Sequence, residues 1–152
     1  MIRISLKLAA LAATISIGAA TAYAKQYVDY TPQKGLWEIN AIEVDPNHVD
    51  EYLTGLRQSQ LPTFEVMKSH GVIDDYRVVV RTGYVKGSPN VLIQVHYPSA
   101  AMLDPDKARD MIIDKESNAR FSEEQNKAAV ANYEKYRTFI DDAMWTDISF
   151  AK

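Results

Sequence analysis

The chain has 152 residues and no cysteine, which excludes disulfide bonds, thiol catalysis, iron–sulfur ligation and a lipoprotein anchor. Its 17 Lys and Arg residues and 20 Asp and Glu residues give a formal net charge of −3. A mildly acidic chain without a basic cluster lacks the electrostatic footprint of a nucleic-acid-binding protein. No glycine-rich phosphate loop, Gly-x-Ser-x-Gly elbow or His-Glu-x-x-His sequence is present, so no motif names a reaction.

The first 24 residues have the composition of a secretory signal peptide. Arg3 and Lys7 precede an apolar run over 8–20, and small residues lead to a predicted cleavage after Ala24. The run is shorter than the roughly 20 residues of a membrane span, and an uncleaved anchor is the alternative. Cleavage removes two basic residues and no acid, leaving 128 residues and a net charge of −5. We therefore expect an exported protein, periplasmic or secreted, without stable membrane insertion after cleavage.

Residues 25–34 have no clear period and predict an extended N-terminal arm, followed by a single domain over 35–152. The first strand is expected from Gly35, with Trp37, Ile39 and Ala41 on its apolar face. This face is expected to lie against the helices.

A helix is predicted after Asp45-Pro46, because Asp accepts free N–H groups of a first helical turn and Pro suits the next position. Its apolar stripe, at alternating steps of four and three, extends to Gly71, a C-cap candidate. Pro62 removes one backbone hydrogen bond, which predicts a kink or break near 59–61.

Residues 76–97 predict a β-hairpin, since apolar residues alternate with others on both sides of the turn-like sequence 86–90. The apolar face contains Tyr76, Val78, Val80, Thr82, Val91, Ile93, Val95 and Tyr97. The opposite face contains Arg77, Val79, Arg81, Leu92, Gln94 and His96.

Two helix starts follow the hairpin. Asp104-Pro105-Asp106 predicts a short helix with Ala108, Met111 and Ile112 facing inward, and Ser122 with Gln125 forms a capping-box pattern. The second helix is expected to direct Ala129, Tyr133, Tyr136 and Ile140 inward. A last strand is predicted over 144–150, where Met144, Thr146, Ile148 and Phe150 alternate with other residues.

This order of strands and helices predicts an α+β fold, the ferredoxin-like β-α-β-β-α-β arrangement with a four-stranded antiparallel sheet and helices on one face. The other face would gather a mixed set of residues: Glu38, Asn40, Ile42, Arg77, Val79, Arg81, Leu92, Gln94, His96, Trp145, Asp147 and Ser149. Such a mixture of polar and large apolar side chains favours partial burial by a second subunit, so we expect a homodimer.

The strand and helix order, the helix-Gly-strand sequence around Gly71 and the two-faced strands resemble the dimeric α/β-barrel superfamily, which includes antibiotic-biosynthesis-monooxygenase-like, EthD-like and NIPSNAP-like proteins. The resemblance extends from about Gly35 to Phe150. It implies two protomers packed sheet to sheet around pockets for small, often aromatic or haem-like ligands. Haem-degrading members use an Asn on the first strand, a Trp and a His on the second helix. Only Asn40 matches, so haem degradation is not carried over.

The candidate site is the polar face of the sheet. His96 is its candidate general base, because imidazole ordinarily titrates near neutral pH, and the guanidinium of Arg77 or Arg81 is suited to a carboxylate or enolate oxygen. Expected ligand-binding residues are Glu38, Asn40, Gln94, Trp145 and Asp147, of which Glu38 or Asp147 would orient the imidazole or pair with an arginine. No histidine pair has metal-ligand spacing, so neither a metal nor a cofactor is expected.

The function therefore has open alternatives. One is a dimer with a pocket for a small apolar or aromatic molecule on the sheet face, acting as a cofactor-independent oxygenase or isomerase or only as a binding protein. Another is a non-enzymatic envelope protein whose polar face is a dimer interface, stabilised by cross-strand ion pairs. A third is a monomer that offers this face to a larger envelope protein.

Overall fold

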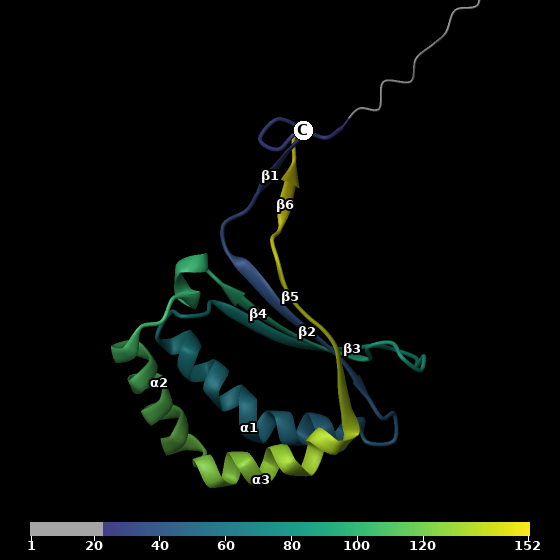
Figure 1. Ribbon diagram of the computed structural model, residues 1–152, viewed down its shortest axis with the longest axis vertical. Coiled ribbons are helices and arrows are strands. Elements are labelled where there is room, and N and C mark those ends of the chain that lie inside the picture. The colour runs from purple at the N-terminus through teal and green to yellow at the C-terminus, as the bar shows by residue number, and fades with distance from the viewer. Residues whose placement is uncertain (1–22) are drawn as a thin grey trace, which may run out of the picture.

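The computed structural model describes residues 23–152, so the signal-peptide prediction lies almost wholly outside the described residues. Its main sheet is antiparallel, with strands in the order β3-β4-β2-β5. The strands are β2 (Leu36–Val44), β3 (Asp75–Val80), β4 (Val91–Tyr97) and β5 (Arg137–Trp145). The helices are α1 (Val49–Ser69), α2 (Lys107–Arg120), α3 (Glu123–Tyr133) and two short 3₁₀ helices, η1 (Ala100–Leu103) and η2 (Glu134–Tyr136). They lie on one side of the sheet (Figure 1), which confirms the predicted ferredoxin-like α+β fold.

The predicted hairpin is confirmed as β3 and β4, which pair in antiparallel register with Arg77 opposite Gln94 and Val78 opposite Ile93. Alternate residues of β4 are buried under the helices, namely Val91, Ile93, Val95 and Tyr97. We call the helix-covered side of the sheet the inner face and the other side the open face.

Strand β2 presents the opposite faces to those predicted. Ile42 and Val44 are fully buried on the inner face, whereas Trp37, Ile39 and Ala41 lie on the open face. The register explains this, because Ile42 pairs with the buried Val91 of β4 and paired residues share a face. Isoleucines occur in both alternating sets of β2, so alternation alone did not identify the buried one.

Helix α1 begins later than predicted. Asp45 caps a turn by accepting the backbone N–H of Asn47, and His48 precedes the first helical residue without a side-chain cap. Gly71 ends the helix as predicted: its φ is +68°, and its N–H and that of the next residue donate to the carbonyls of Lys68 and Met67. Pro62 does not break the helix, which bends along its length (Figure 1).

Helices α2 and α3 begin as predicted. Asp106 accepts the N–H groups of two first-turn residues of α2, and Ser122 with Gln125 forms the expected capping box of α3. The inward stripe predicted for α2 is wrong, since Ala108, Met111 and Ile112 are exposed and Ile113 is its buried residue. A helix that packs mainly against α1 buries a narrower stripe than one lying on the sheet.

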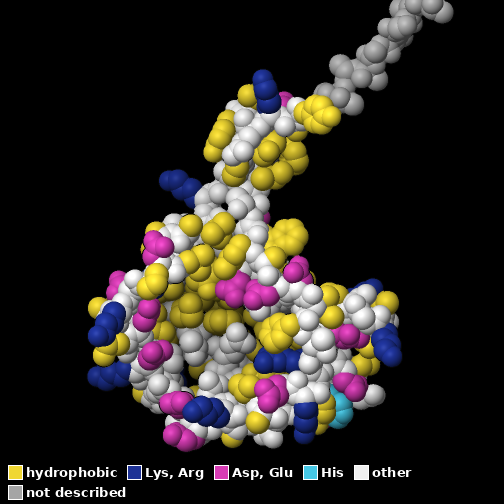
Figure 2. All heavy atoms as spheres, in the orientation of Figure 1, with side chains coloured by type: hydrophobic (Ala, Val, Ile, Leu, Met, Phe, Trp, Pro, Cys, Tyr) yellow, Lys and Arg dark blue, Asp and Glu magenta, His cyan; other side chains and the backbone are white. Residues whose placement is uncertain are grey.

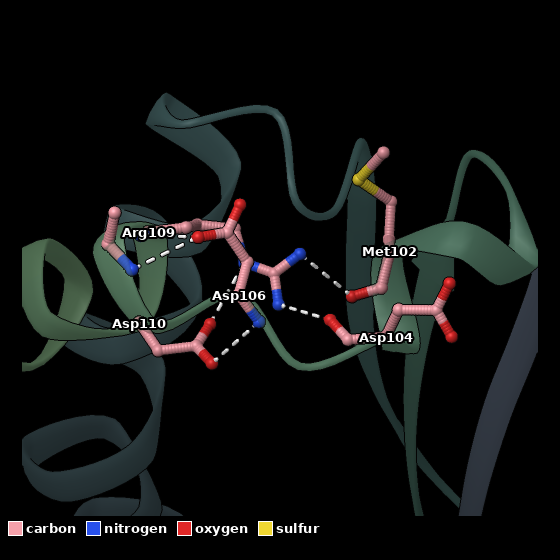
Figure 3. A network of polar contacts seen from close by, with 6 residues as sticks. Met102, Asp104, Asp106, Arg109 and Asp110 are labelled. Atoms are coloured by element: carbon pink, nitrogen blue, oxygen red, sulfur yellow. Dashed lines mark hydrogen bonds and ion pairs between the residues drawn. The ribbon is translucent and has the colours of Figure 1, made fainter.

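Arg109 fixes the connection between η1 and α2 (Figure 3). Its guanidinium donates to the carbonyl of Met102 at 3.2 Å and to that of Asp104 at 2.9 Å, while its Nε donates to the Asp110 carboxylate at 2.9 Å. Asp110 in turn accepts the backbone N–H of Asp106 at 3.3 Å. Arg109 thus joins the end of η1 to the first turn of α2.

The end of α3 differs most from the prediction. The helix stops at Tyr133 and β5 begins at Arg137, so Tyr136 lies in η2 and Ile140 in the strand instead of on an inward helical stripe. The pairing of β5 with β2 shifts by one residue at Ile140, which is a β-bulge. The predicted last strand over 144–150 is therefore the end of β5 together with a separate short strand.

That short strand, β6 (Ile148–Phe150), pairs with β1 (Tyr30–Pro32) in the segment predicted as an extended arm. The β1–β6 ribbon projects away from the layered body (Figure 1) and carries exposed apolar side chains (Figure 2). Within residues 23–152, no helix is both long and apolar enough to cross a membrane.

Candidate functional site

Four side chains form a connected cluster on the open face: Trp37, Asp74, Arg77 and His96. The Arg77 guanidinium lies over the Trp37 ring, 4.2 Å from its centroid, and the His96 ring lies against the same indole at 4.7 Å between centroids. The Nδ1 atom of His96 is 2.5 Å from the Asp74 carboxylate. The His96 side chain is only 18% exposed, whereas that of Asp74 is 52% exposed, so the imidazole is the more desolvated partner.

The sheet register places these groups together. Trp37 on β2 pairs with His96 on β4, and Arg77 on β3 pairs with Gln94, the neighbour of His96 on the same face. Asp74 immediately precedes β3, and its backbone N–H donates to the His96 carbonyl at 3.1 Å. Backbone pairing thus holds both the imidazole and its carboxylate partner.

Gly35 closes one side of the imidazole. Its φ is +88°, and a Cβ at this position would lie 2.6 Å from Nε2 of His96. Only glycine permits both this backbone conformation and this close approach. The absence of a side chain at Gly35 therefore lets the imidazole pack close to the backbone just before β2.

Of the residues predicted for the site, Arg77, Gln94, His96 and Trp145 lie on the open face together, with Trp145 directly opposite Trp37. Asp147 lies at the end of this group, where its carboxylate accepts the indole N–H of Trp37 at 3.1 Å. The placements of Arg77, Gln94 and His96 follow the predicted alternation of the hairpin.

The other predicted residues lie elsewhere. Glu38 and Asn40 are on the inner face, because the register of β2 is opposite to the prediction. Arg81 follows the end of β3 and is exposed, with its backbone N–H bonded to the carbonyl of Asn90 at 2.8 Å. Ser149 belongs to the β1–β6 ribbon.

Glu38 has a different partner from those predicted. Its carboxylate accepts a hydrogen bond from the Tyr97 hydroxyl at 2.8 Å and another from the Asn40 amide at 3.2 Å. Burial, together with this hydrogen bond to a carboxylate, raises the pKa of Tyr97 far above its ordinary value. Glu38 therefore binds Tyr97 and Asn40 on the inner face of the sheet, whereas His96 lies on the open face.

Sequence reasoning assigned Trp37 to the core and did not identify Asp74. The signal for Asp74 was its place just before β3, because the first residues of a hairpin strand lie beside the last residues of its partner. Predicting the Trp37 contact required the register of β2 against β4.

The cluster has groups suited to an oxygen-bearing ligand. Asp74 holds the Nδ1 side of the imidazole, so Nε2, which packs beside the backbone of Gly35, is the ring nitrogen that remains for proton transfer. Within the described chain, no carboxylate lies within ion-pair distance of the Arg77 guanidinium, and stacking on an indole leaves its N–H edge free. The same residues contain no group of three side chains arranged to hold a metal ion.

No protein-family model matches the chain, and no curated protein sequence matches it at a significant level.

Proposed function

We propose that the mature protein is exported and acts as a homodimer in which two open faces pack together as an α/β barrel and enclose a site for a small apolar or aromatic molecule. The observation that supports this proposal is the composition of the open face. Val79 is 42% exposed and Trp145 is 54% exposed, and they share the face with the Trp37, Arg77 and His96 cluster.

Burial of apolar surface contributes about 25 cal/mol per Å², so covering this face with a second copy would stabilise the assembly. In the predicted homodimer, the second copy of the chain covers these apolar side chains, so no other partner is needed to bury them. The polar cluster among them is what distinguishes a ligand site from a purely structural interface.

In this proposal the Trp37 indole binds the flat body of the ligand, and the guanidinium of Arg77 binds a carboxylate or enolate oxygen. His96 accepts a proton through Nε2, with Asp74 as its orienting partner. Cofactor-independent oxygenation or isomerisation is the reaction class that these groups serve.

A second candidate function is a non-enzymatic dimer interface. Its support is that the cluster is already held together by its own contacts, since His96 pairs with Asp74 and Arg77 stacks on Trp37. In that case substitutions in the cluster change only dimer stability and no small molecule is retained.

The dimer is tested by native mass spectrometry of the mature chain, with a matched pair of variants. Val79→Asp places a charge on the open face, and Ile112→Asp places one at an apolar side chain on α2 that is 47% exposed. We expect a dimer for the parent and for Ile112→Asp, and a monomer for Val79→Asp. A monomeric parent, or a dimeric Val79→Asp variant, would contradict the proposed interface.

The ligand site is tested on the chain purified from its own envelope, where native mass spectrometry also detects a retained small molecule. We expect extra mass on the parent and its loss from Arg77→Gln and His96→Gln, whereas Arg81→Gln retains it because Arg81 lies outside the cluster. A dimer that never carries extra mass would favour the interface function.

A further inference from the structure

A cavity lies on the inner face of the sheet, separate from the open-face cluster. It has a volume of about 360 Å³, within the range typical of small-molecule sites. It lies between α1, α3 and the strands β2, β4 and β5, and its lining consists of Asn40, Ser59, Gln60, Thr63, Phe64, Ile93, Asn126, Val130, Tyr133, Arg137 and Phe139. This lining contains one cation and no anion.

Arg137 is the charged residue of this cavity. It opens β5 opposite Val44, and its guanidinium stacks against two aromatic rings, 5.2 Å from the centroid of Tyr133 and 4.7 Å from that of Phe139. Stacking on aromatic faces leaves the N–H donors at the edge of the guanidinium available for another group.

No carboxylate of residues 23–152 forms an ion pair with this guanidinium. Glu43 and Asp45 border a neighbouring hollow that Arg137 also lines, but neither lies within 4.0 Å of its side-chain nitrogens. A half-buried cation without a counter-ion is costly, because it has lost part of its hydration without a compensating charge.

The surroundings of Arg137 contain further unpaired polar groups. The buried Tyr52 hydroxyl has no hydrogen-bond partner at standard distance and angle, and its nearest donor is Arg137: burial raises the pKa of Tyr52, while the hydrogen-bonding and charge of the Arg137 guanidinium oppose that shift. On the cavity wall, the side chains of the half-buried Gln60 and Thr63 and of the exposed Asn126 form no hydrogen bond with any described residue. Ser59 and Tyr133, in contrast, satisfy each other at 2.9 Å.

We propose that this inner cavity binds a small monocarboxylate with an aromatic body. The carboxylate accepts two parallel hydrogen bonds from the planar guanidinium of Arg137. The aromatic body lies among Phe64, Ile93 and Phe139, and polar substituents on it are bound by the free amides and hydroxyl of the wall.

The chemistry of the lining favours this class over others. A phosphate ester carries up to two negative charges and is usually held by several cations or by backbone N–H groups, whereas this cavity has one guanidinium. A cationic ligand would face Arg137 without any anion in the lining. A neutral apolar ligand would leave the guanidinium and the wall amides unpaired.

The site is independent of the proposed open-face function. Arg137 and Phe139 share the inner face with Ile42 and Val44, whereas Arg77 and His96 are on the other side of the sheet. A monomeric protein, or one that retains no open-face ligand, would therefore leave the inner-cavity proposal intact. A failure of the inner-cavity test would likewise leave the open-face proposal intact.

The test is isothermal titration calorimetry of the mature chain with para-hydroxybenzoate and with para-hydroxybenzamide, its neutral analogue of nearly the same shape. We expect the carboxylate to bind about tenfold or more tightly, because hydrogen bonds from a guanidinium to a charged acceptor are stronger than those to a neutral amide. Equal binding of the two compounds, or no binding of either, would overturn the proposal.

Variants then locate the site. Arg137→Met retains an unbranched apolar stem and removes the charge, and we expect it to abolish the preference for the carboxylate. Asn126→Asp introduces an opposing charge at an exposed helical position and is expected to weaken carboxylate binding while the amide binds as before. Arg81→Met is the matched control and should bind like the parent. Unchanged carboxylate preference in Asn126→Asp and Arg137→Met, with folding verified by circular dichroism, would place binding elsewhere and overturn the assignment.

Discussion

The imidazole of His96 occupies the space that a side chain on Gly35 would need. A Cβ at Gly35 would lie 2.6 Å from Nε2 of His96 and 2.7 Å from the backbone oxygen of Tyr97. The first contact can be relieved by rotation of the imidazole, but the second is with the backbone of β4. The approach of Gly35 to β4 is thus part of what positions the candidate site.

Gly35→Ala should destabilise the protein and displace His96. At φ = +88° an L-residue costs about 1–2 kcal/mol, and the steric overlap adds about 1–3 kcal/mol. Gly83→Ala is the matched control, since Gly83 has a φ of +87° with no atom within 4 Å of the added Cβ. Urea unfolding measures both variants. Equal losses of unfolding free energy would show that the contact with β4 has no energetic consequence.

The fold was predictable where its signals are local. The hairpin of β3 and β4, the Gly71 cap and the Ser122 capping box each depend on residues close together in the sequence, and each is confirmed. The start of β5 was not predicted because the spacing of Tyr133, Tyr136 and Ile140 continues a helical period. The β-propensity of Thr138-Phe139-Ile140 was the opposing signal.

The candidate site was predictable to the same extent. His96, Gln94 and Arg77 share a face because strand alternation has a period of two. Contacts that depend on the register of β2, such as that of Trp37 with His96, could not be read from one strand at a time. Arg137 was missed with β5, because it was assigned to a helix.

Asn90 joins the ends of β2 and β4 and should be important for stability. Its buried side chain accepts the N–H of Val44 at 2.7 Å and donates to the Val44 carbonyl at 2.8 Å, as a paired strand residue would. Asn90→Ala leaves both backbone groups without this partner and should cost about 1–3 kcal/mol. Asn47→Ala, in an exposed turn, is the control. It should lower the free energy of unfolding by less than about 1 kcal/mol, because surface substitutions usually have small effects. Thermal unfolding distinguishes them, and similar midpoints would contradict this role.

Tyr76 should make stability sensitive to alkaline pH. Its hydroxyl donates a hydrogen bond to the Glu65 carboxylate, which, with burial, raises the pKa of Tyr76 to about 12. In the unfolded chain the pKa is about 10, so the folded state binds this proton more tightly. The resulting stabilisation is complete below pH of about 10 and is lost as pH rises towards about 12.

Glu65→Gln should lower the pKa of Tyr76 towards its ordinary value, because a neutral acceptor replaces the carboxylate. The variant should therefore lose less stability over this alkaline range than the parent. Tyrosinate absorbance reports the titration, and urea unfolding at several pH values reports the stability. Glu134→Gln, at an exposed position, is the control and should follow the parent. An unchanged tyrosine titration in Glu65→Gln would contradict the coupling.

Arg109→Lys should loosen the connection between η1 and α2 while leaving the sheet intact. A lysine retains the charge but cannot donate simultaneously to the carbonyls of Met102 and Asp104 and to the Asp110 carboxylate in the geometry of the guanidinium. The lost bonds are partly solvated, so the expected cost is about 1 kcal/mol. Hydrogen exchange should accelerate over 102–110 and remain unchanged in β4. Arg120→Lys, at the exposed end of the same helix, is the matched control; equal exchange in the two variants would mean that Arg109 does not fix this connection.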